Sequence, residues 1–207
     1  MCYINKYFPQ LTKEQCEKIF LFSDLILEWN DKINVISRKD TENIELHHII
    51  HSLSISKAVS FAPDSDILDI GTGGGFPGIP LAISFADSRF FLADSISKKI
   101  NVVKDIINKT NIPNAFTINS RVELINRKFD YIVCRAVASL PVITDWAKLL
   151  IKNNKKIKKD FNLFCLKGGD LVPELVELKY NYKIIELADL FDEPFFASKK
   201  LICIKLQ

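Results

Sequence analysis

A glycine-rich turn constrains the fold of this chain more than any other stretch. The segment Ile67–Gly78 holds five of the seven glycines in the 207-residue sequence, and these five fall within eight residues. A short apolar run comes before the glycines, and the segment 79–85 after them has helical spacing. Glycines tolerate positive φ and let a ligand approach the backbone, while the helix N-terminus behind them offers free N–H groups. The pattern therefore predicts a ligand-binding turn between a buried strand and a helix.

The spacing of these glycines decides which class of ligand the turn favours. Gly73, Gly75 and Gly78 formally match the dinucleotide-binding fingerprint G-x-G-x-x-G. That fingerprint should begin at the end of the strand, which is Gly71. Counted from there, the pattern is G-x-G-x-G, and Phe76 stands where the third glycine belongs. The dinucleotide reading is therefore disfavoured.

Two acidic residues extend the pattern. Asp69 lies two residues before the first glycine, and this acid followed by G-x-G-x-G resembles the first motif of class I S-adenosylmethionine (SAM) methyltransferases. Asp94 ends the next apolar run, at about the separation from the turn at which an acid accepts hydrogen bonds from both ribose hydroxyls. The residues thus favour a nucleoside-containing cofactor.

Short apolar runs alternate with helical spacing from residue 66 onward, which predicts a parallel sheet wound with helices. No helix is expected between the last two runs, so they should form a hairpin at the sheet edge. We therefore expect an α/β fold with a seven-stranded, mostly parallel sheet and an antiparallel edge strand. The predicted strands are 66–70, 89–93, 115–118, 129–134, 161–166, 181–187 and 200–206, and the predicted helices are 78–86, 96–110, 140–152 and 170–178.

The first 62 residues have helical spacing and contain no glycine. Thr12 and Gln15 form a capping-box pattern at the start of one helix, which runs to Trp29. A second helix is expected from about residue 40 toward Val59. We expect residues 1–62 to form an N-terminal helical cap on a domain of residues 63–207. The second helix carries the three histidines of the chain, His47, His48 and His51.

Composition limits the classes of function. The net charge of +3 permits a nucleic-acid partner without requiring one. The five cysteines form no C-x-x-C pair, and the histidines have no fourth ligand in view, so neither a disulfide framework nor a metal site is indicated. No signal peptide and no membrane-spanning apolar stretch is visible, so we expect a cytoplasmic protein that does not associate with membranes.

A lysine-rich segment at 152–159 leaves two interpretations open. The neighbouring asparagines, Asn153 and Asn154, indicate an exposed loop. The loop is equally compatible with a solvated connector and with a patch that contacts phosphates. Its five lysines are Lys152, Lys155, Lys156, Lys158 and Lys159.

Taken together, the motifs resemble the bacterial small-subunit (16S) rRNA guanine-N7 methyltransferases, the family formerly called glucose-inhibited division protein B. The resemblance covers nearly the whole chain. It departs from the family pattern at His51, where an aspartate is usual, and at 73–75, where Gly-Pro-Gly is usual. Its signatures are Trp29-Asn30 with Asn34, His48–Ser52, Asp69–Pro80, Asp94-Ser95, Ser120–Glu123, Arg135-Ala136 and Leu166–Gly168.

The resemblance implies a class I, Rossmann-like SAM methyltransferase fold with an N-terminal helical extension. It implies methyl transfer from SAM to N7 of a specific guanine, with 16S rRNA or a small ribosomal subunit particle as partner, and it suggests a monomer. Gly71 and Phe76 would contact SAM, Val122 and Glu123 would flank its adenine, and Arg135 would lie beside its methionine end. The full set of expected cofactor residues is Asp69, Gly71, Gly73, Gly75, Phe76, Asp94, Ser95, Val122, Glu123 and Arg135.

The chemistry of N7 predicts positioning residues in place of a general base. Guanine N7 carries an in-plane lone pair and no proton, so geometry and local electrostatics supply the rate. The Asn/Asp-Pro-Pro-Tyr/Phe segment typical of amine methylation is absent from Cys134–Val137. Arg135 and Lys167 are the candidate positioning residues, although Lys167 is equally compatible with a purely structural role.

Two other functions share the same motifs. A SAM-dependent small-molecule methyltransferase would also use Gly71, Asp94 and Glu123, with the N-terminal helices as a lid over its pocket. A catalytically silent SAM-binding module for ribosome assembly would keep the turn without the chemistry. Methyl transfer to rRNA separates these possibilities.

Overall fold

A seven-stranded sheet forms the centre of the computed structural model, which describes residues 3–153 and 160–206. The strand order is β3-β2-β1-β4-β5-β7-β6. The first five strands pair in parallel, whereas β7 runs antiparallel to both β5 and β6. This confirms the predicted mostly parallel sheet with an antiparallel hairpin at one edge. The strands are β1 (Asp66–Ile70), β2 (Arg89–Asp94), β3 (Ala115–Asn119), β4 (Tyr131–Arg135), β5 (Leu163–Gly168), β6 (Asn181–Glu186) and β7 (Lys199–Lys205).

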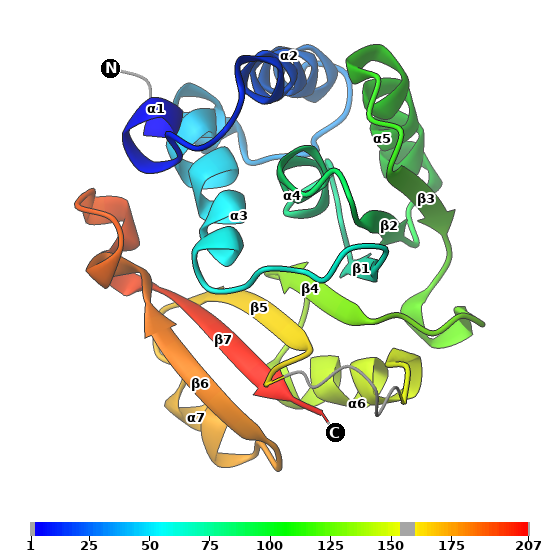
Figure 1. Ribbon diagram of the computed structural model, residues 1–207, viewed down its shortest axis with the longest axis vertical. Coiled ribbons are helices and arrows are strands. Elements are labelled where there is room, and N and C mark those ends of the chain that lie inside the picture. Colours follow the sequence, from blue (N-terminus) through cyan, green and yellow to red (C-terminus); the bar gives the residue numbers. More distant parts are fainter. Residues whose placement is uncertain (1–2, 154–159, 207) are drawn as a thin grey trace.

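Helices cover both faces of the sheet, as Figure 1 shows. Those before β4 pack on one face, and α6 and α7 pack on the other. The α-helices are α1 (Tyr3–Tyr7), α2 (Lys13–Asn30), α3 (His51–Leu53), α4 (Gly78–Ser84), α5 (Ser97–Thr110), α6 (Leu140–Leu150) and α7 (Val172–Val176). The other helical turns are η1 (Arg38–Asn43), η2 (Glu45–Ile50), η3 (Ser54–Lys57), η4 (Val122–Leu124), η5 (Leu187–Asp189) and η6 (Pro194–Ser198).

The predicted elements of the sheet domain are all present, with their ends shifted by a few residues. Strand β5 begins two residues later than predicted. The residue before it, Asn162, accepts through its side-chain Oδ1 from Leu206 N at 2.9 Å. Helix α7 is shorter than the predicted 170–178 and spans only Val172–Val176. Element ends are the least certain part of a prediction because terminal turns depend on local caps.

The N-terminal segment is helical, but its second half is less regular than predicted. The capping box at Thr12 and Gln15 starts α2 as expected. One helix from residue 40 to Val59 was expected, and the chain instead passes through successive 3₁₀, π, α and 3₁₀ turns. Sequence periodicity of 3 to 4 cannot distinguish these geometries. A π turn adds a residue to the helical repeat and often marks a functional site.

The N-terminal helices pack directly under the glycine-rich turn. Phe22 of α2 lies 4.9 Å from Phe76 between ring centroids, and a side chain at Gly74 would meet Ile26 at 3.1 Å. Asn30 ends α2 and holds the next loop, because its Oδ1 accepts from the backbone N–H groups of two residues, 35 and 36. The segment therefore supports the turn from below.

The strand order places a ligand site at the carboxyl end of β1. Strand β1 pairs with β2 on one side and β4 on the other. The strands that follow β1 in sequence therefore extend the sheet first on one side of β1 and then on the other. Ligands of open parallel sheets bind at such a switch point, beyond the carboxyl ends of the strands. In the described part of the chain, no helix is long and apolar enough to cross a membrane.

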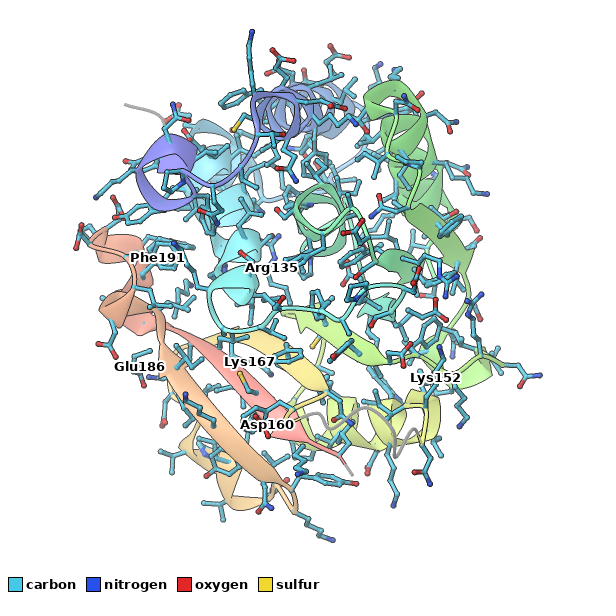
Figure 2. All side chains as sticks on the ribbon, viewed as in Figure 1. Arg135, Lys152, Asp160, Lys167, Glu186 and Phe191 are labelled. Atoms are coloured by element: carbon cyan, nitrogen blue, oxygen red, sulfur yellow. The ribbon has the colours of Figure 1, made fainter. Side chains whose placement is uncertain are left out.

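A charged cluster ties the opposite end of the sheet together. Asp66, only 4% exposed, starts β1. Its carboxylate accepts from Arg89 at 2.7 Å, from Arg127 at 3.0 Å and from Lys152 at 2.9 Å. Lys152 also contacts Asp130 at 2.8 Å. Figure 2 shows Lys152 well apart from Arg135 and Lys167, so this cluster is structural and lies outside the predicted site.

We expect Asp66→Asn to destabilise the protein and to change the pH dependence of its stability. Burial alone would raise the pKa of Asp66, but hydrogen bonds from Lys152, Arg127 and Arg89 lower it below its usual value. The folded state therefore binds fewer protons, and the contribution of Asp66 to stability is complete above the ordinary pKa of about 3.9 and is lost as the pH falls through that value toward the lower folded-state pKa. The substitution should cost about 1–3 kcal/mol at neutral pH.

Urea denaturation from about pH 3 to pH 7 measures both effects. The free energy of unfolding should fall less steeply with acid in Asp66→Asn than in the parent. Asp64→Asn is the matched control because Asp64 is exposed and has a φ of 61°, which asparagine tolerates. Equal pH dependence in the parent and Asp66→Asn would contradict the assignment.

Candidate functional site

A buried carboxylate fixes the glycine-rich turn. Asp69 is fully buried, and its Oδ2 accepts from Gly78 N at 2.9 Å. A Cβ at Gly78 would lie 2.0 Å from Leu92 Cδ2 and 2.7 Å from this oxygen, so only glycine fits there. Burial raises the pKa of Asp69 to about 7, while the Gly78 hydrogen bond and the charge of Arg135 oppose the rise. Asp69 therefore positions the start of α4.

The turn borders a cavity of about 410 Å³ above the carboxyl ends of β1, β2 and β4. Gly71 forms part of its floor, with a φ of 67° and a close approach to Val137 that a Cβ would block at 2.8 Å. Asp94 lies at the rim, where its Oδ2 accepts from Gly73 N at 3.1 Å and its Oδ1 from Ile96 N at 2.8 Å. The rest of this first cavity is lined by apolar side chains such as Ile96 and by polar or charged ones such as Lys99 and Glu123.

This first cavity has the donor and acceptor groups of a nucleoside site. The cavity is framed by two carboxylates, from Asp94 and Glu123, which can accept from ribose hydroxyls or an amino group. Ile96, Val122 and Trp146 offer apolar surface for a flat base. Gly71 has no side chain, so a ligand in this cavity can approach its backbone closely. The residues present therefore fit a nucleoside-containing cofactor.

The structure brings five of the ten expected cofactor residues to this cavity. Their backbone or side-chain atoms line it, whereas the other five lie behind it or beside it. Of the latter, Phe76 is only 3% exposed and packs between Phe22 and Arg135. The lining residues are Gly71, Asp94, Ser95, Val122 and Glu123, and the supporting residues are Asp69, Gly73, Gly75, Phe76 and Arg135.

A second cavity of about 410 Å³ adjoins the first. Ala136, which follows β4 and has a left-handed φ of 51°, lines both cavities. A non-glycine residue in this conformation is strained, and such strain is concentrated at functional sites. The second cavity is lined by Asp40, His47, His48, His51, Arg135, Ala136, Leu166, Lys167, Gly168, Glu174, Phe195 and Lys199.

Arg135 is the central cation of the second cavity. Its Nη2 lies 2.8 Å from His48 Nδ1, its Nη1 donates to the His47 carbonyl at 3.3 Å, and its guanidinium sits 4.8 Å over the Phe76 ring. No carboxylate pairs with it in the described part of the chain. Burial lowers the pKa of Arg135 to about 10, so it is charged at neutral pH. Figure 2 shows Arg135 beside α3 and above Lys167.

The contact with Arg135 fixes the tautomer of His48. A guanidinium can only donate, so His48 Nδ1 accepts and the proton of the neutral ring sits on Nε2. Burial, assisted by the charge of Arg135, lowers the pKa of His48 to about 3. Burial also lowers the pKa of His51 well below its usual value. Both rings are therefore neutral near pH 7, and the Nε2 atoms of both are buried without a partner among the described residues.

The amino group of Lys167 is held by other protein groups, whereas a lysine that binds phosphate needs a free amino group. Its Nζ donates to the Ala138 carbonyl at 2.6 Å and to Glu174 Oε2 at 2.8 Å, and its side chain is 10% exposed. These contacts favour the structural interpretation. In the lysine-rich segment, Lys152 belongs to the Asp66 cluster, while the other lysines of 152–159 lie outside the described residues.

Several site residues escaped prediction from sequence. Phe195 reaches the second cavity from η6, close to the C-terminus, and stacks on His47 at 4.0 Å between centroids. Asp40 was expected only as a helix start. Trp146 lies on α6 with ordinary helical spacing, so no local signal marks it. Ile96 did carry a signal, because it is an apolar residue two positions after the strand-end acid Asp94. In the structure its side chain is 47% exposed.

Comparison with known proteins identifies the family. The family model described as rRNA small subunit methyltransferase G matches residues 15–200. The ribosomal RNA small subunit methyltransferase G of Christiangramia forsetii is 46% identical over 204 residues, covering 99% of this chain and 96% of the other. The protein of the same name from Flavobacterium johnsoniae is 44% identical, covering 99% and 97%.

Solved structures support the fold assignment. Magnesium protoporphyrin IX methyltransferase from Synechocystis, determined with bound SAM, gives a TM-score of 0.61 at 14% identity and covers 94% of this chain and 98% of the other. Precorrin-6y C5,15-methyltransferase from Geobacter metallireducens gives 0.54 at 12% identity, covering 83% and 90%. The sheet is thus that of SAM-dependent methyltransferases, as the sequence predicted. The near-complete match to its relatives shows that this chain belongs to the rRNA small subunit methyltransferase G family.

Proposed function

We propose that this chain transfers a methyl group from SAM to N7 of a guanine in small-subunit rRNA. The observation that carries the proposal is the pair of adjoining cavities, both lined by Ala136, in a chain of this family. One cavity has the groups of a nucleoside site and the other has a buried cation and an aromatic wall. A nucleoside-containing cofactor in the first cavity and a base in the second can therefore meet near the end of β4.

The first cavity fits SAM. Asp94 would accept from the ribose hydroxyls, with Val122 and Ile96 against the adenine and Gly71 beneath the ligand. Arg135 lies on the side of the second cavity, where the methionine end would point. When bound, SAM supplies a methyl group on a positively charged sulfonium.

The residues of the second cavity suit attack by a ring nitrogen. The N7 lone pair forms the new N–C bond while the S–C bond breaks and its electron pair stays on sulfur. No proton is lost, so no base is required. Arg135 can donate to the guanine O6, which adjoins N7, and so hold the lone pair in line. The neutral His48 fixes the guanidinium in that role.

The position of the N-terminal helices favours an RNA substrate over a small molecule. A small-molecule enzyme of this fold would use these helices as a lid. Here α2 packs against the turn in the core, through Phe22 and Ile26. No residue of α2 lines either cavity. Lys99, Arg121 and Lys199 lie around the two cavities and can contact RNA phosphates. With an rRNA substrate, we expect the protein to act in the cytoplasm. We also expect it to be a monomer.

Mapping N7-methylguanosine in small-subunit rRNA tests the proposal. Borohydride and aniline cleave RNA at this base, so rRNA from cells with and without the protein should differ by one cleavage site. Purified protein, SAM and unmodified rRNA or small-subunit particles should restore the site. A catalytically silent assembly module would bind SAM without restoring it.

We expect Asp94→Asn to weaken SAM binding about ten- to a hundredfold. A charged acceptor contributes about 1.5–3 kcal/mol per hydrogen bond, and asparagine removes the charge while it preserves the size. Isothermal titration calorimetry with SAM measures the loss. Asp145→Asn is the control, because Asp145 is exposed on α6 and does not line the first cavity. Affinity within twofold of the parent for Asp94→Asn would reject the ribose assignment.

We expect the rate of methyl transfer in single turnovers to stay level between about pH 6 and pH 8.5. A histidine base with an ordinary pKa of about 6.5 would make the rate rise up to that value. Burial lowers the pKa of His48 to about 3 and the pKa of His51 well below its usual value. Both side chains are therefore neutral throughout this range. A titration near neutrality that disappears in His48→Ala or His51→Ala would show that proton transfer matters and that N7 is the wrong acceptor.

A further inference from the structure

The second cavity contains a carboxylate that the chemistry above does not use. Asp40, whose side chain is 37% exposed, places Oδ1 2.9 Å from His47 Nδ1. Its Oδ2 lies 4.0 Å from His48 Nε2, which is beyond hydrogen-bond distance. Among the side chains that the structure describes, it pairs with no lysine or arginine. One oxygen is therefore held by His47, and the other is available on the cavity side.

The imidazole of His48 sets this carboxylate opposite the Arg135 guanidinium. Nδ1 of the ring faces Arg135 and Nε2 faces Asp40. The cavity thus presents a donor group on one side of a fixed, neutral ring and an acceptor group on the other. The Nε2–H group between them is buried and has no hydrogen-bond partner among the described residues, and the nearest acceptor on the cavity side is Asp40 Oδ2.

The other carboxylate of the cavity is already neutralised. Glu174 Oε2 accepts from Lys167 Nζ at 2.8 Å and from Leu140 N at 2.6 Å. These contacts tie α7 to the ends of β5 and α6. Asp40 is therefore the better candidate to contact a ligand.

This arrangement is complementary to guanine and not to adenine. Guanine presents the acceptors O6 and N7 on one edge and the donors N1–H and 2-amino on the next. Adenine presents a donor in place of O6 and an acceptor at N1. With O6 toward Arg135, guanine would turn its N1–H and 2-amino groups toward a carboxylate. The same orientation would leave adenine with two mismatched contacts.

An aromatic wall completes the base site. The His47 ring stacks on Phe195 at 4.0 Å with an interplanar angle of 14°, and Lys199 Nζ lies 4.8 Å over the Phe195 ring. Enzymes that act on a base take it out of the stack, hold it against aromatic side chains and read its Watson–Crick edge by hydrogen bonds. Asp40 also fixes the His47 ring that forms part of this wall.

We propose that Asp40 is the residue that selects guanine, and that its carboxylate accepts from N1–H and the 2-amino group of the target base in the second cavity. The inference rests on the proposed function, because it takes a guanine of RNA as the acceptor. It assigns to Asp40 a specificity-determining role toward the substrate. His47 and His48 act as positioning residues on either side of it.

Inosine at the target position tests this role without any change to the protein. Inosine keeps O6, N7 and N1–H but lacks the 2-amino group. Once the modified guanine has been mapped, small-subunit rRNA is prepared with guanosine or inosine at that position. The parent should show a kcat/KM about ten- to a hundredfold lower for inosine, as expected for one lost hydrogen bond to a charged group. Equal rates within twofold would overturn the proposal.

Asp40→Asn then assigns the preference to this residue. The amide oxygen can still accept from His47, while the amide NH₂ replaces the free carboxylate oxygen and opposes the donors of guanine. Methylation of the guanosine RNA should fall at least tenfold, and the ratio of guanosine to inosine rates should approach one. SAM affinity should stay at the parent value, which verifies that the variant is folded. A ratio equal to that of the parent would reject the assignment.

Glu42→Gln is the matched control, because Glu42 is an exposed acid on the same 3₁₀ turn and does not line the second cavity. It should leave both rates and their ratio unchanged. The outcomes also separate the two proposals. Absence of methyl transfer from the parent to guanosine RNA would contradict the proposed function, whereas transfer without discrimination would contradict only the role of Asp40.

Discussion

The bond between the Asp69 carboxylate and the Gly78 amide is the interaction on which the rest of the site depends. It joins the end of β1 to the first residue of α4 in a fully buried position. Because Gly78 has no side chain, Leu92 of β2 can pack against the same point. The glycines between these residues are thereby held as an open loop against the carboxyl ends of three strands, and the N-terminal helices close the space below. Loss of this contact would move the floor of the first cavity.

Most of the fold follows from patterns that are local in the sequence. Alternation of buried strands with helical spacing is strong in this chain, so the strands and helices of the sheet domain were predicted to within a few residues. The geometry of 38–57 was not predicted, because 3₁₀, π and α turns share nearly the same apolar spacing. The separation of residues 1–62 as a cap stays a prediction. These helices share one continuous apolar core with the sheet through residues such as Phe22 and Ile26.

The candidate site divides in the same way. Residues at strand ends, such as Asp94 and Arg135, were predictable because a parallel sheet brings its carboxyl ends to one edge. Glu123 could be found only through the family resemblance. Asp40 and Phe195 could not be found at all, since they reach the second cavity from turns that no periodicity places together. Lys167 was predictable in position, but its partners Ala138 and Glu174 depend on packing that a sequence does not display.

The position of Ala136 has a consequence for binding in the two cavities. Because this one residue lines both cavities, ligands bound in the two cavities would contact the same point of the backbone. Where two binding sites are coupled, the factor by which the first ligand raises the affinity for the second equals the factor by which the second raises the affinity for the first. A single residue in a left-handed conformation is therefore the point at which binding in the two cavities can be coupled.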